Sequence, residues 1–265
     1  MIKLEGVADT LYIPLIARIY VSKRFPEYFF DGKALSLENE LMDKINQKKP
    51  SEFFQMASAA RYYLLDSMTK NFLAKNDKSN VINLGAGLET VYFRLENKRD
   101  LFYEVDLPKV IEKRRSLLGE SLNEILIGAD MFTLDWVKSI DRTLPTLFIV
   151  MGVFQYYGEE KIIAFIKDLK NSFPKAEIIF DATNEKGVKF ANRYVKKTGN
   201  TSAPIHFFIN DAAQFAKITE TTLIDRCPFF IEARKTIGKR LKLLTRLAMK
   251  IVDLSGRAIL VWLRF

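Results

Sequence analysis

The chain has 265 residues, of which 48% are hydrophobic and 28% are charged, and its net charge is +9. The 21 Phe and 10 Tyr exclude a disordered chain, because disorder requires low hydrophobicity. No apolar run approaches the roughly 20 residues that a membrane span requires. The only cysteine, Cys227, excludes an internal disulfide, and with one histidine in the chain no metal site is expected. We expect a reduced, cytoplasmic protein without a transmembrane segment.

The first part of the chain has a helical pattern. Helices are predicted at 35–45 and at 51–74, the second of them beginning at the N-cap residue Ser51. A polar loop at 76–80 ends this region. The pattern predicts a group of helices before the first strand.

From residue 81 onward, apolar strands alternate with helices. The predicted strands lie at 81–84, 100–105, 125–128, 146–153 and 177–181, and the helices between them at 108–118, 134–139 and 159–172. This alternation is typical of a parallel sheet that is covered on both faces. A long polar and aromatic segment follows. The last predicted elements are a helix at 211–217, a strand near residue 223, a basic helix and a final strand at 258–265.

A glycine turn follows the first predicted strand. The sequence Val81-Ile-Asn-Leu-Gly85-Ala-Gly87 ends in a Gly-x-Gly turn, where a nucleotide-like ligand can approach the main chain. A strand-to-helix turn without a ligand is the alternative. Thr90 stands where a dinucleotide-binding motif has its third glycine, and the Glu89 carboxylate repels a phosphate. The turn therefore favours a nucleoside ligand without phosphates over NAD.

Acidic residues end the next two predicted strands. Asp106 lies 19 residues after Gly87, the place of an acid that binds ribose hydroxyls; capping of the helix at Pro108 is the alternative role. Asp130 can accept the amino group of adenine while Met131 packs on the ring, and ordinary turn chemistry is the alternative there. Three such features after three successive strands indicate one binding crevice.

These motifs resemble one known family. Val81–Thr90, Tyr103–Arg114 and Met151–Tyr157, together with Gly6–Pro14 and Phe180-Asp-Ala-Thr-Asn, are similar to the leucine carboxyl methyltransferase and polyketide O-methyltransferase superfamily. The resemblance implies an α/β fold with a Rossmann-like class I methyltransferase sheet, mostly parallel with an antiparallel last strand. It also implies S-adenosylmethionine as the cofactor. The expected reaction is methyl transfer to a carboxylate or hydroxyl of a small, polyketide-like acceptor.

The resemblance also implies how the chain is divided. An N-terminal helical cap is expected at 1–78 and a cofactor-binding core at 79–265. Within the core, residues at about 181–211 are expected to form an insertion that faces the substrate. A loop of that length inside a compact domain usually has a function.

Individual residues take roles from the same resemblance. Gly85 and Gly87 would bracket the methionine part of the cofactor, Asp106 would bind the ribose, and Asp130 and Met131 would lie at the adenine. All five residues follow the three predicted strands whose ends indicate one crevice.

One further cofactor residue is expected in the cap, and two motifs depart from the family. Arg61 matches the family arginine that pairs with the cofactor carboxylate, and an Arg in an apolar helical stretch requires such a partner. A protein acid such as Asp66 is the alternative partner. The family usually has Asp-Thr-Arg where this chain has Glu89-Thr-Val91. Met151, counted among the cofactor-binding residues, replaces a glutamate, which leaves open how the cofactor amine or the substrate is held.

No catalytic residue is identified. Methyl transfer from a sulfonium has a good, neutral leaving group, so alignment and exclusion of water supply most of the rate. A carboxylate acceptor needs no base, whereas a hydroxyl acceptor gains from one. The candidates are Tyr156, Tyr157 and His206. Ordinary aromatic packing is the alternative for the tyrosines, and a packed strand at 204–208 is the alternative for the histidine.

The positive charge is concentrated near the end of the chain. From Glu232 to Lys250 there are seven basic residues and one acid, a net charge of +6. Apolar residues recur there at helical spacing: Ile237, Leu241, Leu244, Ala248 and Ile251. We expect this apolar face to dock on the sheet and the basic face to be solvated.

Two other functions stay open on the sequence alone. A methyltransferase fold without activity could bind an anionic surface through the basic helix. An NAD-linked oxidoreductase is the less favoured alternative. Nucleic acid is not expected as a partner.

Overall fold

The computed structural model describes residues 4–43, 50–97, 99–197 and 204–265. The chain divides into two compact units. The first comprises residues 1–70, 88–97 and 228–255, and the second comprises 71–87, 98–227 and 256–265. The predicted cap at 1–78 thus accounts for most of the first unit, which also takes residues 88–97 and the basic segment from the predicted core.

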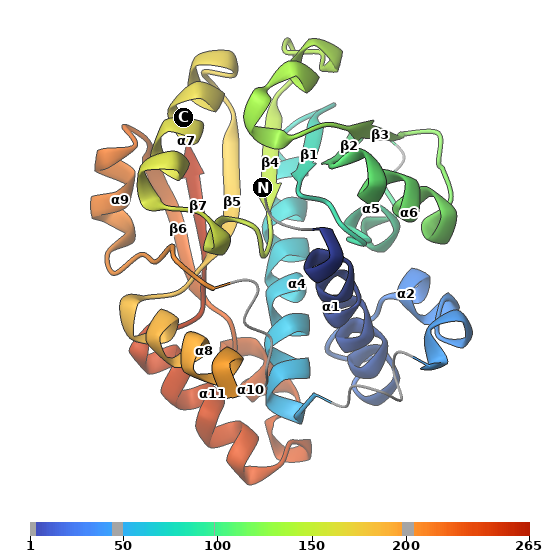
Figure 1. The fold of residues 1–265 in the computed structure, drawn as a ribbon, viewed down its shortest axis with the longest axis vertical. Coiled ribbons are helices and arrows are strands. Elements are labelled where there is room, and N and C mark those ends of the chain that lie inside the picture. The colour runs from blue at the N-terminus through green and yellow to red at the C-terminus, as the bar shows by residue number, and fades with distance from the viewer. Residues whose placement is uncertain (1–3, 44–49, 98, 198–203) are drawn as a thin grey trace. The chain divides into compact units, whose positions relative to one another are not determined.

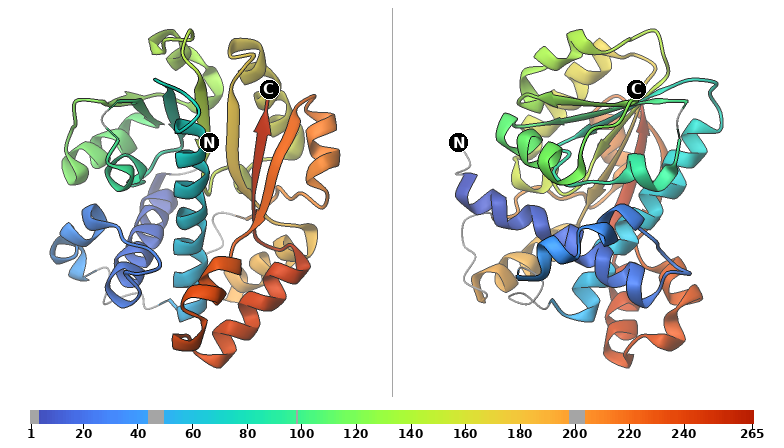
Figure 2. Two further views of the ribbon diagram at one scale, coloured as in Figure 1. Left: turned by 180° about the vertical axis from the view of Figure 1, so that it is seen from behind. Right: turned by 90° about the vertical axis from the view of Figure 1, so that its right-hand side faces the viewer.

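The second unit contains a seven-stranded sheet (Figures 1 and 2). Its strands are β1 (Asn80–Leu84), β2 (Leu101–Asp106), β3 (Glu124–Gly128), β4 (Thr146–Val150), β5 (Glu177–Ala182), β6 (Thr222–Pro228) and β7 (Ile259–Arg264). The order across the sheet is β3-β2-β1-β4-β5-β7-β6, so that β7 lies between β5 and β6 (Figure 2). The first five strands pair in parallel, and β7 pairs antiparallel with β5. This confirms the predicted mostly parallel sheet with an antiparallel last strand.

Amphipathic helices cover this sheet. They are α6 (Pro108–Leu118), α7 (Glu159–Ser172) and α9 (Ala212–Ile218), with the 3-10 turns η2 (Met131–Thr133), η3 (Asp135–Ser139) and η4 (Phe154–Tyr156). Helix α8 (Glu185–Lys197) follows β5 along the chain. In α7, Ile162, Ile166 and Leu169 recur at helical spacing and are buried in one core with Phe148 and Phe180 of the sheet. These contacts hold α7 against the sheet.

The first unit is helical. It contains α1 (Leu4–Arg24), α2 (Gly32–Ser36), η1 (Asn39–Leu41), most of α4 (Glu52–Leu73), α5 (Val91–Leu95), α10 (Ile231–Thr236), η5 (Gly238–Arg240) and α11 (Leu243–Ser255). Asp31 begins α2 as an N-cap, since its Oδ1 accepts the Ala34 N–H at 2.8 Å. Ring stacking of Tyr28 on Tyr63, with centroids 4.6 Å apart, adds to its core.

Three element predictions are wrong in detail. The helix predicted at 35–45 is instead α2 and η1, and residues 44–49 lie outside the described residues. The predicted insertion at about 181–211 contains α8, where no helix was predicted, and its residues 198–203 also lie outside the described part. The single basic helix is divided into α10, η5 and α11. Polar composition concealed α8, and Gly238 interrupts the basic helix at a residue of poor helix propensity.

Two kinds of feature are absent from the described part of the chain. No three His, Cys, Asp or Glu residues are grouped there as metal ligands. No helix there is long and apolar enough to cross a membrane.

Candidate functional site

The predicted glycine turn lies at the carboxyl end of β1. Gly85 and Gly87 have φ of +68° and +51°, a region that glycine adopts without steric cost. The Gly85 N–H donates to the Val105 carbonyl at 2.8 Å, which holds the turn beside β2. A Cβ added to Gly85 would lie 2.4 Å from Cγ2 of Val153. Both the backbone conformation and the packing therefore require glycine at position 85.

Asp106, the last residue of β2, holds this turn. Its Oδ2 accepts the Gly87 N–H at 2.8 Å and its Oδ1 accepts the Leu107 N–H at 2.7 Å. Leu107 is the N-cap residue of α6, so Asp106 does not cap that helix as the alternative supposed. Burial raises the pKa of Asp106, and the two backbone N–H groups and Arg114 oppose that rise. Each carboxylate oxygen keeps a further lone pair that can accept a ligand hydroxyl.

A buried ion cluster that the sequence analysis missed supports the turn from the same unit. Arg114 of α6 pairs through Nη2 with Glu124 at 2.5 Å and with Glu104 at 3.2 Å, and all three side chains are fully buried. Nη1 of Arg114 donates to the Gly87 carbonyl at 3.3 Å, and Asn83 donates to Glu104 at 2.9 Å. Gly87 is thus fixed at both its N–H and its carbonyl. A basic residue among the apolar positions of α6 was the available signal.

Asp130 and Met131 follow β3, as predicted. Asp130 is exposed, and its Oδ1 accepts the Phe132 N–H at 3.0 Å, which is the turn chemistry considered as its alternative. Met131 is buried in the core, and its carbonyl accepts a hydrogen bond from Trp136 at 3.0 Å. The Asp130 carboxylate therefore closes a turn and still faces solvent with free acceptor capacity. Contact of either residue with adenine stays a prediction.

Tyr157 lies close to the two strand-end carboxylates. Burial raises the pKa of its hydroxyl, and the charges of Asp130 and Asp106 raise it further. The Tyr157 ring meets the Phe132 ring edge to face with centroids 4.6 Å apart, and Nζ of Lys161 lies 4.6 Å from the Tyr157 centroid. A phenol with a raised pKa stays protonated at neutral pH. Tyr157 is therefore suited to donate a hydrogen bond and not to act as a base.

The end of β4 carries Met151 and a neighbouring carboxylate. Met151 is nearly buried, and Gly152 after it has φ of +72°. The Gly152 N–H donates to Oδ1 of Asp181 in β5 at 2.6 Å. Asp181, to which the sequence analysis gave no role of its own, thus brings a carboxylate to the strand end where Met151 replaces the family's glutamate.

Two catalytic candidates remain, Tyr156 and His206. Tyr156 is half-buried in η4. His206 is exposed, and its main-chain N–H donates to the Gln155 carbonyl at 2.7 Å. Residues 204–208 form no strand, so the packed strand considered as the alternative is wrong. Neither a base role nor an acceptor contact is tested by this geometry.

Arg61 lies in α4, in the first unit. Its Nη2 donates to the Tyr62 hydroxyl at 3.1 Å. Asp66, weighed as its partner, accepts two hydrogen bonds from Arg94, at 2.8 and 2.7 Å. The bidentate partner of Asp66 is therefore Arg94, and the pairing of Arg61 with a cofactor carboxylate stays a prediction.

Glu89 belongs to a buried cluster of the first unit and not to a helical turn. Helix α5 begins only at Val91. Oε1 of Glu89 lies 2.6 Å from Nη1 of Arg94, and its Oε2 lies 3.6 Å from Nη1 of Arg18. Nε of Arg18 in turn lies 2.9 Å from Oδ2 of Asp31. Burial opposes ionisation, but Arg94 and Arg18 lower the pKa of Glu89 to about 2. The positive charges of these two guanidinium groups neutralise the charge of the Glu89 carboxylate. The prediction that Glu89 repels a phosphate is therefore not supported.

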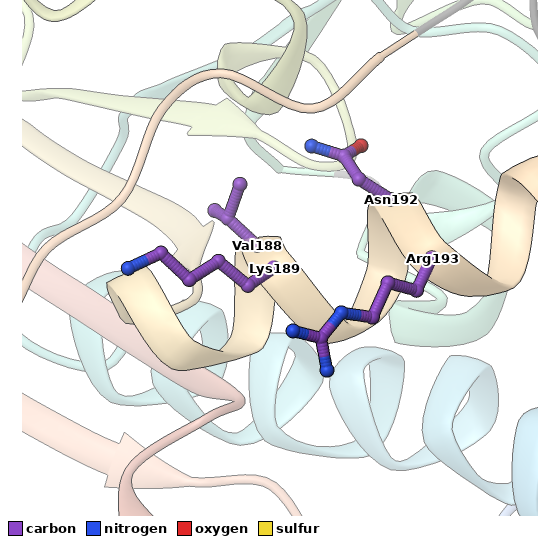
Figure 3. Close-up of a pocket in the computed structure, with 4 residues that line it drawn as sticks. All are labelled: Val188, Lys189, Asn192 and Arg193. Carbon is purple, nitrogen blue, oxygen red and sulfur yellow. The ribbon is translucent and has the colours of Figure 1, made fainter.

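A hollow of about 250 Å³ lies on α8 (Figure 3). It is lined by Val188, Lys189, Asn192 and Arg193, and Figure 3 shows the side chains of Val188 and Asn192 on the same side of the helix. The Asn192 amide donates to the carbonyl of Ile205 and accepts from its N–H, both at 2.9 Å. None of the four lining residues is a predicted cofactor residue, so the hollow does not mark the strand ends.

More than half of the chain matches one protein family. A family model described as leucine carboxyl methyltransferase matches residues 11–170. The chain belongs to the leucine carboxyl methyltransferase family. This methyltransferase uses S-adenosylmethionine, as the motifs at the strand ends indicated. The NAD-linked oxidoreductase and the fold without activity are thereby set aside.

Relatives of this methyltransferase agree with the family and with the fold. Tetracenomycin polyketide synthesis O-methyltransferase TcmP of Streptomyces glaucescens is 27% identical over 203 residues, which cover 76% of this chain and 75% of that protein. A solved DUF574 family protein from Streptomyces avermitilis MA-4680 superposes with a TM-score of 0.61 at 12% identity, over 94% of this chain and 96% of its own. Magnesium protoporphyrin IX methyltransferase from Synechocystis PCC 6803, solved with bound S-adenosylhomocysteine, gives 0.52 at 12% identity, over 86% and 95%.

The residues at the strand ends fit an adenosyl amino acid. Gly85 and Gly87 present main chain without side chains, and Asp106 offers acceptors for ribose hydroxyls between two backbone N–H groups that fix its position. Asp130 adds an exposed acceptor one strand further along the sheet. The hydrogen-bond acceptors at this edge thus suit hydroxyl and amino groups of a ligand.

Proposed function

We propose that this methyltransferase transfers the methyl group of S-adenosylmethionine to a carboxylate or hydroxyl oxygen of a small, polyketide-like acceptor. The observation that carries the proposal is the fixed Asp106 carboxylate beside the Gly85–Gly87 turn, at the carboxyl end of neighbouring parallel strands. The relative TcmP, a polyketide synthesis O-methyltransferase, supports the acceptor class. The family description, leucine carboxyl methyltransferase, supports a carboxylate as the other acceptor.

The cofactor-binding roles follow from the strand ends. In our proposal Asp106 accepts hydrogen bonds from the ribose hydroxyls, Asp130 accepts the adenine amino group, and Met131 contacts the ring. Gly85 and Gly87 bracket the methionine part. When bound, the cofactor supplies an electrophilic methyl group on a sulfonium. The chain's own part is to hold the ligand in line with the acceptor and to exclude water.

Two side chains are proposed to hold the amino acid end of the cofactor. Arg61 is proposed to pair with its carboxylate, since a guanidinium binds a carboxylate through two parallel hydrogen bonds. Asp181 is proposed to supply the carboxylate that Met151 lacks, because it is already fixed at this strand end through Gly152. Met151 itself then contributes apolar contact beside the reacting methyl group.

The acceptor decides whether a base is needed. A carboxylate is ionised at neutral pH and attacks directly, whereas a hydroxyl must lose a proton during attack. Tyr157 keeps its proton because its pKa is raised, so we propose that it orients the acceptor or the cofactor as a donor. Tyr156 and His206 stay candidates for contact with the acceptor. The expected cytoplasmic location and the absence of a nucleic acid partner also stay predictions.

The test is methyl transfer from cofactor labelled in its methyl group to a panel of small aromatic hydroxyl and carboxyl acceptors. Label is expected in the products of one acceptor class. Mild alkali then separates the two chemistries, because a methyl ester releases labelled methanol and a methyl ether does not. Binding of S-adenosylmethionine with no transfer to any oxygen acceptor, or transfer only to nitrogen acceptors, would overturn the proposal.

A further inference from the structure

The outer face of α11 is apolar and exposed, whereas Ile237 and Leu241, which precede α11 in the predicted basic helix, are buried. Five large aliphatic residues expose between 49% and 80% of their surface: Leu243, Leu244, Leu247, Ile251 and Leu254. Thr245 and Met249, on the opposite face of the helix, are buried. We call the five exposed residues the α11 stripe. Leu244 and Ile251, which were expected to dock on the sheet, belong to it.

The stripe is one continuous surface. At 3.6 residues per turn, its five residues fall within an arc of about 100°. Single exposed aliphatic residues are common on proteins and need no explanation. Five of them side by side along one helix make a patch of the kind that marks an interaction site.

Basic residues border the stripe. Arg246 and Lys250 are exposed on the helical position next to Leu243 and Leu254. Asp253, the acidic residue of α11, is held by Arg234, whose Nη2 lies 2.9 Å from Oδ2 of Asp253. The acid therefore does not offset the two cations. Lys239 and Lys242, both exposed, add positive charge just before the helix.

The apolar stripe and its basic border together favour one kind of binding partner. A second copy of the chain, packed stripe to stripe, would bring the basic borders of both copies together and repel. An acidic protein without an apolar surface would leave the stripe exposed. An anionic lipid surface satisfies both parts, since acyl chains receive the stripe while headgroups pair with the cations.

We propose that α11 binds the surface of an anionic membrane. The helix has 13 residues and is about 20 Å long, which is shorter than the roughly 30 Å hydrocarbon core. It therefore lies in the interface, with the stripe below the headgroups and Arg246 and Lys250 at their level. This membrane contact is additional to methyl transfer and does not depend on it.

The experiment is flotation of the full chain with vesicles of phosphatidylcholine alone or with added phosphatidylserine. Binding is expected only to the vesicles that contain phosphatidylserine, and added salt weakens it. The variant R246E/K250E is expected to bind more than tenfold more weakly, since each cation near such a surface contributes roughly fivefold. The variant L244S/L247S/I251S is expected to lose binding by a similar factor or more.

A matched control is Leu122→Ser. Leu122 is 96% exposed in the turn before β3, and this variant also loses an exposed leucine. It is expected to bind vesicles as the unchanged chain does. All variants are expected to keep their affinity for S-adenosylmethionine, which separates loss of membrane binding from loss of folding.

Three results would overturn the proposal. One is no vesicle binding by the unchanged chain. Another is equal binding to neutral vesicles or undiminished binding by R246E/K250E. The third is a dimer in analytical ultracentrifugation that L244S/L247S/I251S abolishes while vesicles are not bound, because a second copy would then cover the stripe.

Discussion

Asp106 and Arg61 are opposite charges proposed for opposite ends of one ligand. Asp106 is fixed by the N–H groups of Gly87 and Leu107, and Arg61 lies in α4 beside Tyr62. S-Adenosylmethionine contains both a ribose and an amino acid carboxylate, whereas adenosine contains only the ribose. Binding of the two ligands to a variant of each residue therefore separates the role of Asp106 from that of Arg61.

Asp106→Asn is expected to weaken binding of both S-adenosylmethionine and adenosine. The neutral amide loses charge-assisted hydrogen bonds to the ribose, a loss of about 1.5–3 kcal/mol, which is roughly tenfold to hundredfold in Kd. Isothermal titration calorimetry with each ligand measures this. An unchanged adenosine affinity in a folded variant would remove Asp106 from the ribose site.

Arg61→Gln is expected to weaken binding of S-adenosylmethionine roughly tenfold to hundredfold and to leave adenosine binding unchanged. The lost interaction is a bidentate ion pair with a carboxylate that adenosine does not have. The same calorimetric titrations give the answer. An equal loss for both ligands would mean that Arg61 acts through the fold of its unit and not through the carboxylate.

The sequence permitted some of these residues to be predicted and not others, for a physical reason. Gly85, Gly87 and Asp106 lie at the ends of predicted strands. The carboxyl ends of parallel strands meet at one edge of the sheet, independently of the side chains that surround them. Arg114 and Asp181 depend on partners that only the folded register brings within reach. Single-sequence patterns do not contain that register.

At the scale of elements, the turn between β1 and α5 is restricted in two separate ways. Gly85 has a positive φ, and Val153 leaves no space for a Cβ. Gly119, after α6, also has a positive φ of +76°, but nothing lies within 4 Å of an added Cβ. The two glycines therefore allow backbone strain and steric overlap to be measured apart.

Gly85→Ala is expected to destabilise the protein by about 2–5 kcal/mol, and Gly119→Ala by only about 1–2 kcal/mol. The smaller figure is the strain of an alanine at φ +76° and ψ −164°, a region that glycine adopts almost alone, and the excess comes from overpacking against Val153. Denaturant unfolding followed by circular dichroism measures both. Val153→Ala in the Gly85→Ala background should recover part of the excess, and equal losses at both glycines would contradict the packing argument.

Elements were predictable where apolar periodicity is strong. The amphipathic α7 and the apolar strands β1 and β4 appear where their patterns indicated, because their burial is set by local sequence. Helix α8 is amphipathic but was missed, because its many charged residues and Gly187 make the segment polar as a whole. In α11 the helical spacing of the aliphatic residues was predicted correctly. Their burial was not, because the aliphatic face of this helix is exposed.

At the scale of the whole molecule, buried ion clusters link stability to pH. Glu89 has a pKa lowered to about 2 from 4.5, so its stabilising contribution is present above pH 4.5 and is lost as the pH falls towards 2. Burial raises the pKa of Asp66 in the same cluster, and that contribution has the opposite sign. A substitution of Glu89 alone isolates its contribution to the pH dependence of stability.

Glu89→Gln is expected to lower the free energy of unfolding at neutral pH by about 3 kcal/mol, because Arg94 and Arg18 lose a buried carboxylate. Below pH 4.5 the difference from the unchanged chain should shrink and approach zero near pH 2. Urea unfolding at a series of pH values measures the difference. A difference that stays constant across that range would contradict the lowered pKa.

Each of the two units carries its own buried ion cluster. Arg114 with Glu104 and Glu124 supports the sheet unit, and Arg94 with Glu89 supports the helical unit. Family membership extends over residues 11–170, which include parts of both units. The proposed cofactor residues belong to the sheet unit, except Arg61, which belongs to the helical unit.

Hydrogen–deuterium exchange with and without S-adenosylhomocysteine tests the location of the cofactor most directly. Bound ligand should slow exchange in peptides that cover 85–88, 106–107 and 130–132, the ends of the first three strands. Peptides from α8, which lines the hollow around Asn192, should be unaffected. Tight binding that protects α8 and leaves the three strand ends unchanged would contradict the account.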